Sequence, residues 1–503
     1  MAKAHDSRPD VDPLDVHTDE HRSLDPENWD ELRALAHAML DHAFDHHQNV
    51  RSRPVWRHVP EEVRAALHQP LPDTPQGAAG VCRELIGSIL PYGTGNIHPR
   101  FFGWVHGTGT PGGIIAEMMA AAINANCGGR EHAAIHVEKQ VVAWFREIFA
   151  FPQTASGLLV SGTSMATLIA LTAARNAGAG TDVREHGVPA LPERMVAYTS
   201  AEAHGSVEKA MEIIGLGRAA LRNVDVDGAG RMNVSALRAS VAADKAAGLK
   251  PFAVIATAGT VNTGAFDPLD EIASIAAQDG VWLHVDGAFG ALAILSDADR
   301  HKVRGIERAD SLAFDFHKWL HVPYDAGMVL IRDGGVHRAA FGSKQDYLAG
   351  TERGLAAGQP WFCEFGPELS RGFRALKVWF TLKEHGLRRL GEKIGDNCRQ
   401  AEWLAQRISG HEELEPLAPV ALNIVCFRYA DQRLDDRELD RLNEEIVILL
   451  QERGIAAPST TRLDGVLAIR VNITNHRTRI EDLEVLVEAV LEFGGQIAAA
   501  MTA

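Results

Sequence analysis

The fold class is decided by the stretch DPLDEIASIAAQDGVWLHVD, residues 267–286. Asp267 can cap the N-terminus of a helix, Pro268 suits the first helical position, and Gly280 suits the residue just after a helix end. The apolar run Val281–Val285 follows at once, and its length is typical of a buried strand. The stretch therefore predicts a helix that leads directly into a strand.

Similar short apolar runs recur on both sides of this unit, with helical patterns between them. Strands that alternate with helices favour a mainly parallel sheet whose faces are covered by helices. We therefore predict an α/β domain whose other strands are Gly157–Val160, Met195–Thr199, Phe252–Thr257, Ser311–Phe316 and Gly327–Ile331.

Two other regions flank this domain. Residues 1–95 are interpreted as an N-terminal arm with helices, and residues 96–374 as the large α/β domain. Near residue 375 the pattern changes to helices that alternate with two apolar strands, Leu422–Phe427 and Val466–Ile473, so residues 375–503 are expected to form a smaller α+β domain.

The composition of the 503 residues narrows the class of protein. Hydrophobic residues make up 46% and charged residues 23%, as in ordinary globular proteins, and the formal net charge is −16. This charge argues against nucleic acid or an anionic membrane as a partner. We find no run of about 18 apolar residues and expect no membrane span. The polar N-terminus and five separated cysteines without a CxxC pair favour a cytoplasmic protein with reduced thiols.

Two strand ends carry residues that fit one chemistry. Lys318, in DFHKW, follows the apolar strand near 311–316, where a partly desolvated amine can form a Schiff base. Asp286 ends the run VWLHVD, at the edge of a parallel sheet where ligands bind. A carboxylate there can keep a pyridinium nitrogen protonated, which makes the ring an electron sink. Each residue alone is more often a surface lysine or a loop cap.

Two further strand ends fit the same site. The segment Ser161–Thr167 (SGTSMAT) opens a helix, where hydroxyls, free backbone N–H groups and the helix dipole suit a phosphate. His204 stands where the strand Met195–Thr199 passes into a helix, and its imidazole can stack on a planar ring. An ordinary helix cap and a solvated histidine are the alternatives. The shared placement of all four signals at strand ends favours one binding site.

Together these pieces resemble the group II pyridoxal-phosphate decarboxylases, which include aromatic-L-amino-acid, histidine and glutamate decarboxylases. The resemblance runs from about His98 to Thr478. Its motifs are HPRFFG at 98–103, SGTSMAT at 161–167, AEAHGSVEKA at 201–210, ATAGTVNTG at 256–264, HVDGAF at 284–289, FDFHKW at 314–319 and LAIRV at 467–471.

The resemblance implies an aspartate-aminotransferase-like fold (PLP fold type I) with a seven-stranded sheet, and pyridoxal 5'-phosphate as cofactor. It also implies a homodimer with shared active sites, and the N-terminal arm is expected to take part in dimerisation. It implies decarboxylation of an L-amino acid to the amine and carbon dioxide, without a metal. It implies that Lys318 forms the Schiff base, that Asp286 pairs with the ring nitrogen and that His204 stacks on the ring. Thr163 and Ser164 would hold the phosphate with His317 nearby, and Thr257 and Ala288 would line the ring. Trp104 would line the substrate pocket, and Arg470 would help to hold the substrate carboxylate.

Departures from the family pattern leave alternatives open. Phe362 falls at or near the position of the usual loop tyrosine, the proposed proton donor, so decarboxylation coupled to oxidative deamination is an alternative; His204 is another source of the proton. Asp315 stands where many relatives carry Asn, and a carboxylate beside a phosphate is unfavourable unless it is paired or points away. A carbon–carbon lyase of the same fold and a non-catalytic scaffold are further alternatives.

The substrate is left open at this stage. Trp104 and Phe102 favour an aromatic side chain, whereas Arg130, in a segment expected to reach in from a partner subunit, favours an acidic one. A helix near the N-terminus carries several histidines, including His42 and His46 at i,i+4, and is interpreted as a solvated or interface face, not a metal site.

Overall fold

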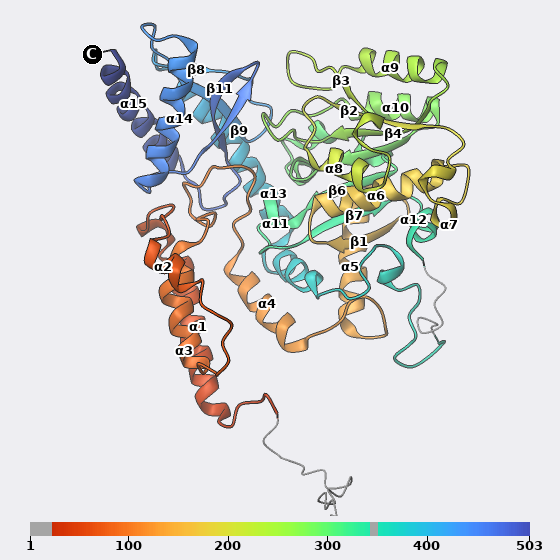
Figure 1. The fold of residues 1–503 in the computed structure, drawn as a ribbon, viewed down its shortest axis with the longest axis horizontal. Coiled ribbons are helices and arrows are strands. Elements are labelled where there is room, and N and C mark those ends of the chain that lie inside the picture. The colour runs from red at the N-terminus through yellow and green to blue at the C-terminus, as the bar shows by residue number, and fades with distance from the viewer. Residues whose placement is uncertain (1–22, 343–350, 503) are drawn as a thin grey trace, which may run out of the picture.

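A computed structural model describes residues 23–342 and 351–502, and its largest sheet, with seven strands, lies in the right half of the view in Figure 1. The strand order is β1-β7-β6-β5-β4-β2-β3, and within this sheet β7 alone runs against the others. The strands are β1 (Ser156–Val160), β2 (Met195–Ser200), β3 (Leu221–Val224), β4 (Lys250–Thr257), β5 (Trp282–Asp286), β6 (Ser311–Asp315) and β7 (Gly327–Ile331). The mainly parallel α/β fold expected from the sequence is confirmed.

The sheet is buried because alternate residues of each strand enter two different apolar cores. In β6, Leu312 and Phe314 belong to the core on one face, while Ala313 belongs to the core on the other. In β4, Val254 and Ile255 divide in the same way. The covering helices are α5 (Ala133–Ile148), α6 (Thr163–Gly178), α7 (Val183–His186), α8 (Ser206–Ile213), α9 (Val234–Ala246), α10 (Leu269–Asp279) and α12 (Gly334–Phe341).

A second, antiparallel sheet with the order β10-β11-β9-β8 forms the core of the C-terminal region. Its elements are β8 (Leu414–Pro416), β9 (Ile424–Tyr429), α14 (Asp436–Glu452), β10 (Ser459–Leu463), β11 (Val466–Asn472) and α15 (Ile480–Thr502). The helix α13 (Arg374–Ser409) joins this region to the large one: Val378 and Ile394 enter the large core, and Leu404 enters the small one.

The N-terminal helices form a limb that extends away from both sheets (Figure 1). They are α1 (Trp29–Gln48), α2 (Glu61–Ala66) and α3 (Ala78–Glu84), and α4 (Pro111–Ile123) follows. Asn28 caps α1 through hydrogen bonds from Asp30 and Glu31, yet no residue of α1 is buried. This limb therefore presents apolar side chains that its own chain leaves uncovered. Residues 1–22 of the expected arm lie outside the described residues.

One local expectation is wrong. Helix α10 begins at Leu269, and Asp267 accepts hydrogen bonds from the backbone N–H groups of Met232 and Thr257, both at 2.7 Å, instead of capping it. These donors come from distant segments, which local sequence patterns do not show. Gly280 ends the helix in the left-handed conformation, as expected (φ 67°).

The expectation that the chain has no membrane span bears on its C-terminal helix. Helix α15 is long and apolar enough to cross a membrane by length and composition, with a mean hydropathy of 1.4. One side of it, including Leu483, Leu486 and Val490, is fully buried in the core of the small sheet. Such packing is that of a core helix, so length and apolar composition alone are weak evidence that α15 crosses a membrane.

Candidate active site

A cavity of about 400 Å³ opens at the carboxyl ends of the large sheet's strands. Five strand ends converge there because β1, β2, β4, β5 and β6 run in the same direction. All eight residues that the sequence predicts for cofactor binding line this cavity: Thr163, Ser164, His204, Thr257, Asp286, Ala288, His317 and Lys318. Trp104, predicted for the substrate pocket, lines it as well.

Lys318 is held at the edge of the cavity by an ion pair. Its Nζ lies 2.9 Å from Oδ2 of Asp315, three residues earlier. The other carboxylate oxygen, Oδ1, accepts a hydrogen bond of 2.7 Å from the backbone N–H of Thr163 at the start of α6. Burial lowers the pKa of Lys318, but the carboxylates of Asp315 and Asp286 outweigh it and the net pKa is raised. The free amine is therefore an ammonium at neutral pH.

Asp286 supplies a second buried carboxylate at the end of β5. Burial raises its pKa, and the charges of Lys318 and His204 oppose that rise, as does a hydrogen bond of 3.1 Å from the backbone N–H of Ala288. A carboxylate in such a site is stable when a cation lies against it. The arrangement suits a protonated ring nitrogen placed between Asp286 and the bulk of the cavity.

His204 lines the cavity in the loop between β2 and α8. Its Nδ1 accepts a hydrogen bond of 3.2 Å from the backbone N–H of Ser206, and the hydroxyl of Ser206 lies 2.8 Å away. Because Nδ1 accepts this hydrogen bond, the ring N–H lies on Nε2. His204 can then donate from Nε2 to an anionic group in the cavity.

The polar atoms of the cavity fit pyridoxal phosphate. In the described part of the chain, the buried hydroxyls Oγ1 of Thr163 and Oγ1 of Thr257 have no hydrogen-bond partner. Buried hydroxyls without partners are costly unless a ligand binds them. The hydroxyl of Thr163 lies at the N-terminus of the 16-residue helix α6, where a phosphate is favoured. The cavity thus offers a phosphate cradle, an amine and a ring carboxylate.

The outer wall of the cavity is aromatic. Trp104, with φ 50° and a side chain 56% exposed, stacks on His106 at 5.6 Å between ring centroids. Tyr324 lies 4.3 Å from the ring of His317 and 6.2 Å from that of His106. Burial raises the pKa of Tyr324, so its hydroxyl keeps its proton at neutral pH.

Sequence reasoning missed Tyr324. Its position could have indicated it: Tyr324 lies six residues after Lys318, in the loop between β6 and β7. Because β7 is antiparallel to β6, this loop lies at the same edge of the sheet as Lys318. The sequence left two options for the Asp315 carboxylate, which could be paired or point away from the phosphate. In the structure it is paired with Lys318.

Arg470 does not reach the cavity. Its side chain is buried, and its guanidinium donates to the backbone carbonyls of Trp104 (2.9 Å), Asn262 (3.2 Å) and Val261 (2.5 Å). The predicted contact with a substrate carboxylate is therefore corrected: these carbonyls occupy its N–H groups. Arg470 instead fixes two segments that line the cavity, around Trp104 and Val261.

Phe362 and Arg130 also lie away from the cavity of their own chain. Phe362 is buried in an apolar core, and its ring lies 5.2 Å from the guanidinium carbon of Arg371. Arg130 stacks on Trp361 at 4.1 Å. A role for either residue in catalysis would require a second copy of the chain.

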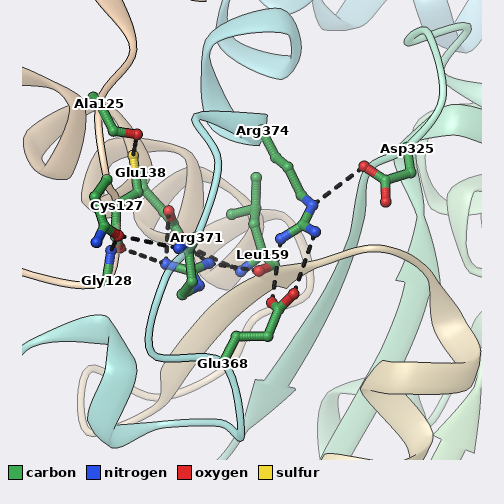
Figure 2. A network of polar contacts seen from close by, with 10 residues as sticks. Ala125, Cys127, Gly128, Glu138, Leu159, Asp325, Glu368, Arg371 and Arg374 are labelled. Atoms are coloured by element: carbon green, nitrogen blue, oxygen red, sulfur yellow. Dashed lines mark hydrogen bonds and ion pairs between the residues drawn. The ribbon is translucent and has the colours of Figure 1, made fainter. Parts of the chain in front are cut away.

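A buried ion-pair network fixes the segment that carries Phe362 (Figure 2). Arg371 and Glu138 are both 1% exposed and lie 2.6 Å apart, and Arg371 also donates to the carbonyls of Cys127 and Leu159. Nearby, Arg374 lies 3.2 Å from Asp325, the neighbour of Tyr324 in the sequence. The network ties this segment to the loop that forms the cavity wall.

The N-terminal histidines contact arginines. The Nδ1 of His46 contacts Arg53, and the Nδ1 of His47 lies 3.1 Å from Arg477. Residues 23–342 and 351–502 contain no group of three His, Cys, Asp or Glu side chains arranged to hold a metal.

Comparison with known proteins identifies the family. Residues 60–430 match the pyridoxal-dependent decarboxylase conserved domain. The chain is 34% identical to an aromatic-L-amino-acid decarboxylase of Bacillus atrophaeus, over 90% of this chain and 93% of that protein. It is 32% identical to an L-2,4-diaminobutyrate decarboxylase of Rhizobium meliloti (strain 1021), over 84% and 83%.

Solved structures agree with this match. The crystal structure of Oryza sativa TDC with PLP and tryptamine superposes with a TM-score of 0.86 at 25% identity, over 94% of this chain and 100% of that one. The fold is therefore the PLP fold type I expected from the sequence, and the cofactor is pyridoxal phosphate. The chain belongs to the pyridoxal-dependent decarboxylase family and is a pyridoxal-phosphate-dependent amino acid decarboxylase, a carboxy-lyase.

Proposed function

We propose that this enzyme converts an aromatic L-amino acid to its amine and carbon dioxide, and that Lys318 is the amine that binds the cofactor aldehyde covalently. The observation that carries the proposal is the single cavity in which the Lys318 amine, the buried Asp286 carboxylate and the unpartnered Thr163 hydroxyl face one another. These are the groups that an aldehyde, a ring nitrogen and a phosphate require.

When bound, pyridoxal phosphate supplies a ring that accepts the electron pair left behind as carbon dioxide departs. Asp286 keeps a proton on the ring nitrogen, because its buried carboxylate favours a neighbouring positive charge. His204 covers one face of the site and donates from Nε2 to the substrate carboxylate, which orients the bond to be broken. Tyr324 and His204 are the cavity groups that can return a proton to the substrate carbon.

The aromatic wall supports the choice of substrate class. Trp104, His106 and Tyr324 form a stacked set at the open side of the cavity, where the substrate side chain must enter. Arg130, the group that favours an acidic side chain, is engaged with Trp361. The relative from Bacillus atrophaeus, named for aromatic amino acids, supports the same class.

A carbon dioxide release assay over the common L-amino acids tests the proposal. We expect turnover with tryptophan, tyrosine or phenylalanine, and none with the Lys318→Ala variant. Turnover restricted to glutamate or to diamino acids would overturn the substrate class, and release by Lys318→Ala at the wild-type rate would overturn the role of Lys318.

Phe362 favours a second candidate, decarboxylation with oxidative deamination. In that reaction the amino acid, dioxygen and water give an aldehyde, carbon dioxide, ammonia and hydrogen peroxide. A site that returns the proton slowly allows dioxygen to react first, and Phe362 has no hydroxyl to donate. We favour the amine because Tyr324 offers a phenol within the cavity itself. Peroxide equal to the carbon dioxide released would establish the second reaction instead. The carbon–carbon lyase alternative has no observation in its favour.

We further propose that the enzyme is a homodimer that shares its active sites. Apolar side chains on the N-terminal limb and on α4 are left exposed; they include Trp29, Val81, Ile89, Met118, Met119 and Ile123. Exposed apolar surface of this extent is typical of protein interfaces. Light scattering coupled to size-exclusion chromatography should give twice the chain mass; a stable, active species of 54.5 kDa would contradict it. The cytoplasmic location stays a prediction.

A further inference from the structure

Asp315 occupies an unusual position between the two groups that the cofactor needs. Its Oδ2 lies 2.9 Å from the Lys318 amine and 3.7 Å from Nε2 of His317, and its Oδ1 accepts from the Thr163 backbone N–H at 2.7 Å. The side chain is 3% exposed. One carboxylate therefore binds both the amine that meets the aldehyde and the helix end that meets the phosphate.

The carboxylate is fixed in this place. Strand β6 ends at Asp315, and the single helical turn α11 (Phe316–Trp319) brings Lys318 back over it at i,i+3. A Cβ atom on Gly327 would lie 2.6 Å from Oδ1 of Asp315, and one on Gly162 would lie 3.5 Å from it. These two glycines leave space for the carboxylate but little freedom to turn away.

We propose that Asp315 is a positioning residue that holds the free Lys318 amine as an ammonium and opposes entry of the cofactor's phosphate at the N-terminus of α6. The proposal rests on the proposed function of Lys318. To bind the aldehyde, the ammonium first gives one proton to solvent; the neutral amine then forms one C=N bond and one water molecule leaves. Asp315 makes the first step costly, and its charge weakens the attraction of α6 for a phosphate dianion.

The titratable groups around Lys318 come from several elements. Asp286 faces it from β5, His204 from the start of α8, His106 from the loop before α4, and His317 and Tyr324 from its own loop. Asp286 is the other carboxylate among them and stays in place when Asp315 is altered. A change at Asp315 alone therefore removes one of two negative charges and lowers the pKa of Lys318 without abolishing the pairing of the ring nitrogen.

The substitution Asp315→Asn tests the proposal, because Asn can still accept from the Thr163 backbone N–H. The matched control is Asp299→Asn, since Asp299 is also buried and also pairs with a lysine at i,i+3, Lys302, outside the cavity. In protein stripped of cofactor, acetylation of Lys318 is followed against pH by peptide mass spectrometry. An opposite charge in contact moves a pKa by about 1–3 units, so Asp315→Asn should make Lys318 about tenfold or more reactive at pH 7.

Two binding measurements complete the test. Titration with pyridoxal phosphate at pH 7, followed by visible absorbance, should show half-loading of Asp315→Asn at a concentration about tenfold or more below that of the wild type. Inorganic phosphate should bind the stripped variant more tightly by calorimetry, while Asp299→Asn matches the wild type in every assay. An unchanged acetylation profile, or weaker binding of both ligands, would overturn the proposal.

The outcomes separate this inference from the proposed function. A wild-type protein that never takes up pyridoxal phosphate refutes the function of Lys318, while its acetylation profile still reports the effect of Asp315. If Asp315→Asn does not fold, as judged by circular dichroism, Asp315→Ser removes the same charge with a smaller side chain and is expected to show the same increase in reactivity.

Discussion

Arg470 donates from Nη1 to the backbone carbonyl of Trp104 at 2.9 Å, so strand β11 of the small sheet holds one wall of the active-site cavity. The same guanidinium reaches the carbonyls of Val261 and Asn262 on another wall. One buried side chain of the small sheet therefore holds two segments that line the cavity, and the shape of the substrate side of the cavity depends on it.

We predict that Arg470→Lys raises KM for the substrate more than it lowers kcat. A lysine cannot reach three carbonyls at once, so about 1–3 kcal/mol of stability is lost through unpaired buried carbonyls, and the Trp104 wall loosens. Steady-state kinetics and thermal unfolding check this. A large loss of kcat with unchanged thermal stability would instead indicate direct contact with the reacting carboxylate.

The substitution Asp286→Asn should lower kcat by about 100-fold or more, because the ring nitrogen loses the carboxylate that keeps it protonated. The amide has nearly the same shape, so the fold and the hydrogen bond from Ala288 to the side-chain oxygen should remain. Kinetics and the absorbance spectrum of the bound cofactor give the readout. Wild-type kcat in this variant would mean that the ring sits elsewhere in the cavity.

Tyr324→Phe should reduce amine formation by about 100-fold and increase peroxide per carbon dioxide released, because it removes the phenol that faces Lys318 and His106. Burial raises the pKa of Tyr324, so the phenol stays protonated and this role should persist at least up to pH 10. The control is Tyr429→Phe, a buried tyrosine in the core of the small sheet. Unchanged products of Tyr324→Phe would indicate that His204, not Tyr324, donates the proton.

Glu138→Gln should destabilise the fold by about 3–5 kcal/mol, because it leaves the buried Arg371 charge without its partner. The exposed pair Arg388–Glu392 offers a comparison, and Glu392→Gln should cost about 0–1 kcal/mol. Urea unfolding of both variants measures the difference. Equal stability of the two variants would show that Arg371 is held by the carbonyls of Cys127 and Leu159 alone.

The sequence predicted the cofactor residues because each stands at the end of a strand. Lys318, Asp286 and Thr163 come directly after apolar runs, and the strands that carry them all run in one direction, so local patterns and one topological rule bring them together. The strand β3 was not predicted, because it lies at the edge of the sheet and only Val224 is buried.

The contacts that cross large sequence separations could not be predicted. Arg470 meets Trp104 across 366 residues and Asp315 meets Thr163 across 152, and no periodicity records such pairs. Asp267 fails as a helix cap for the same reason, since distant backbone N–H groups bind its carboxylate more effectively than the helix would.

The central claim is that the amine of Lys318 binds the cofactor, and reduction of the purified enzyme with borohydride tests it most directly. The reductant fixes the bond between the amine and the cofactor, and peptide mass spectrometry then locates it. We predict a single pyridoxyl phosphate group on Lys318. A label on another lysine, or none in an enzyme that still releases carbon dioxide, would contradict the account.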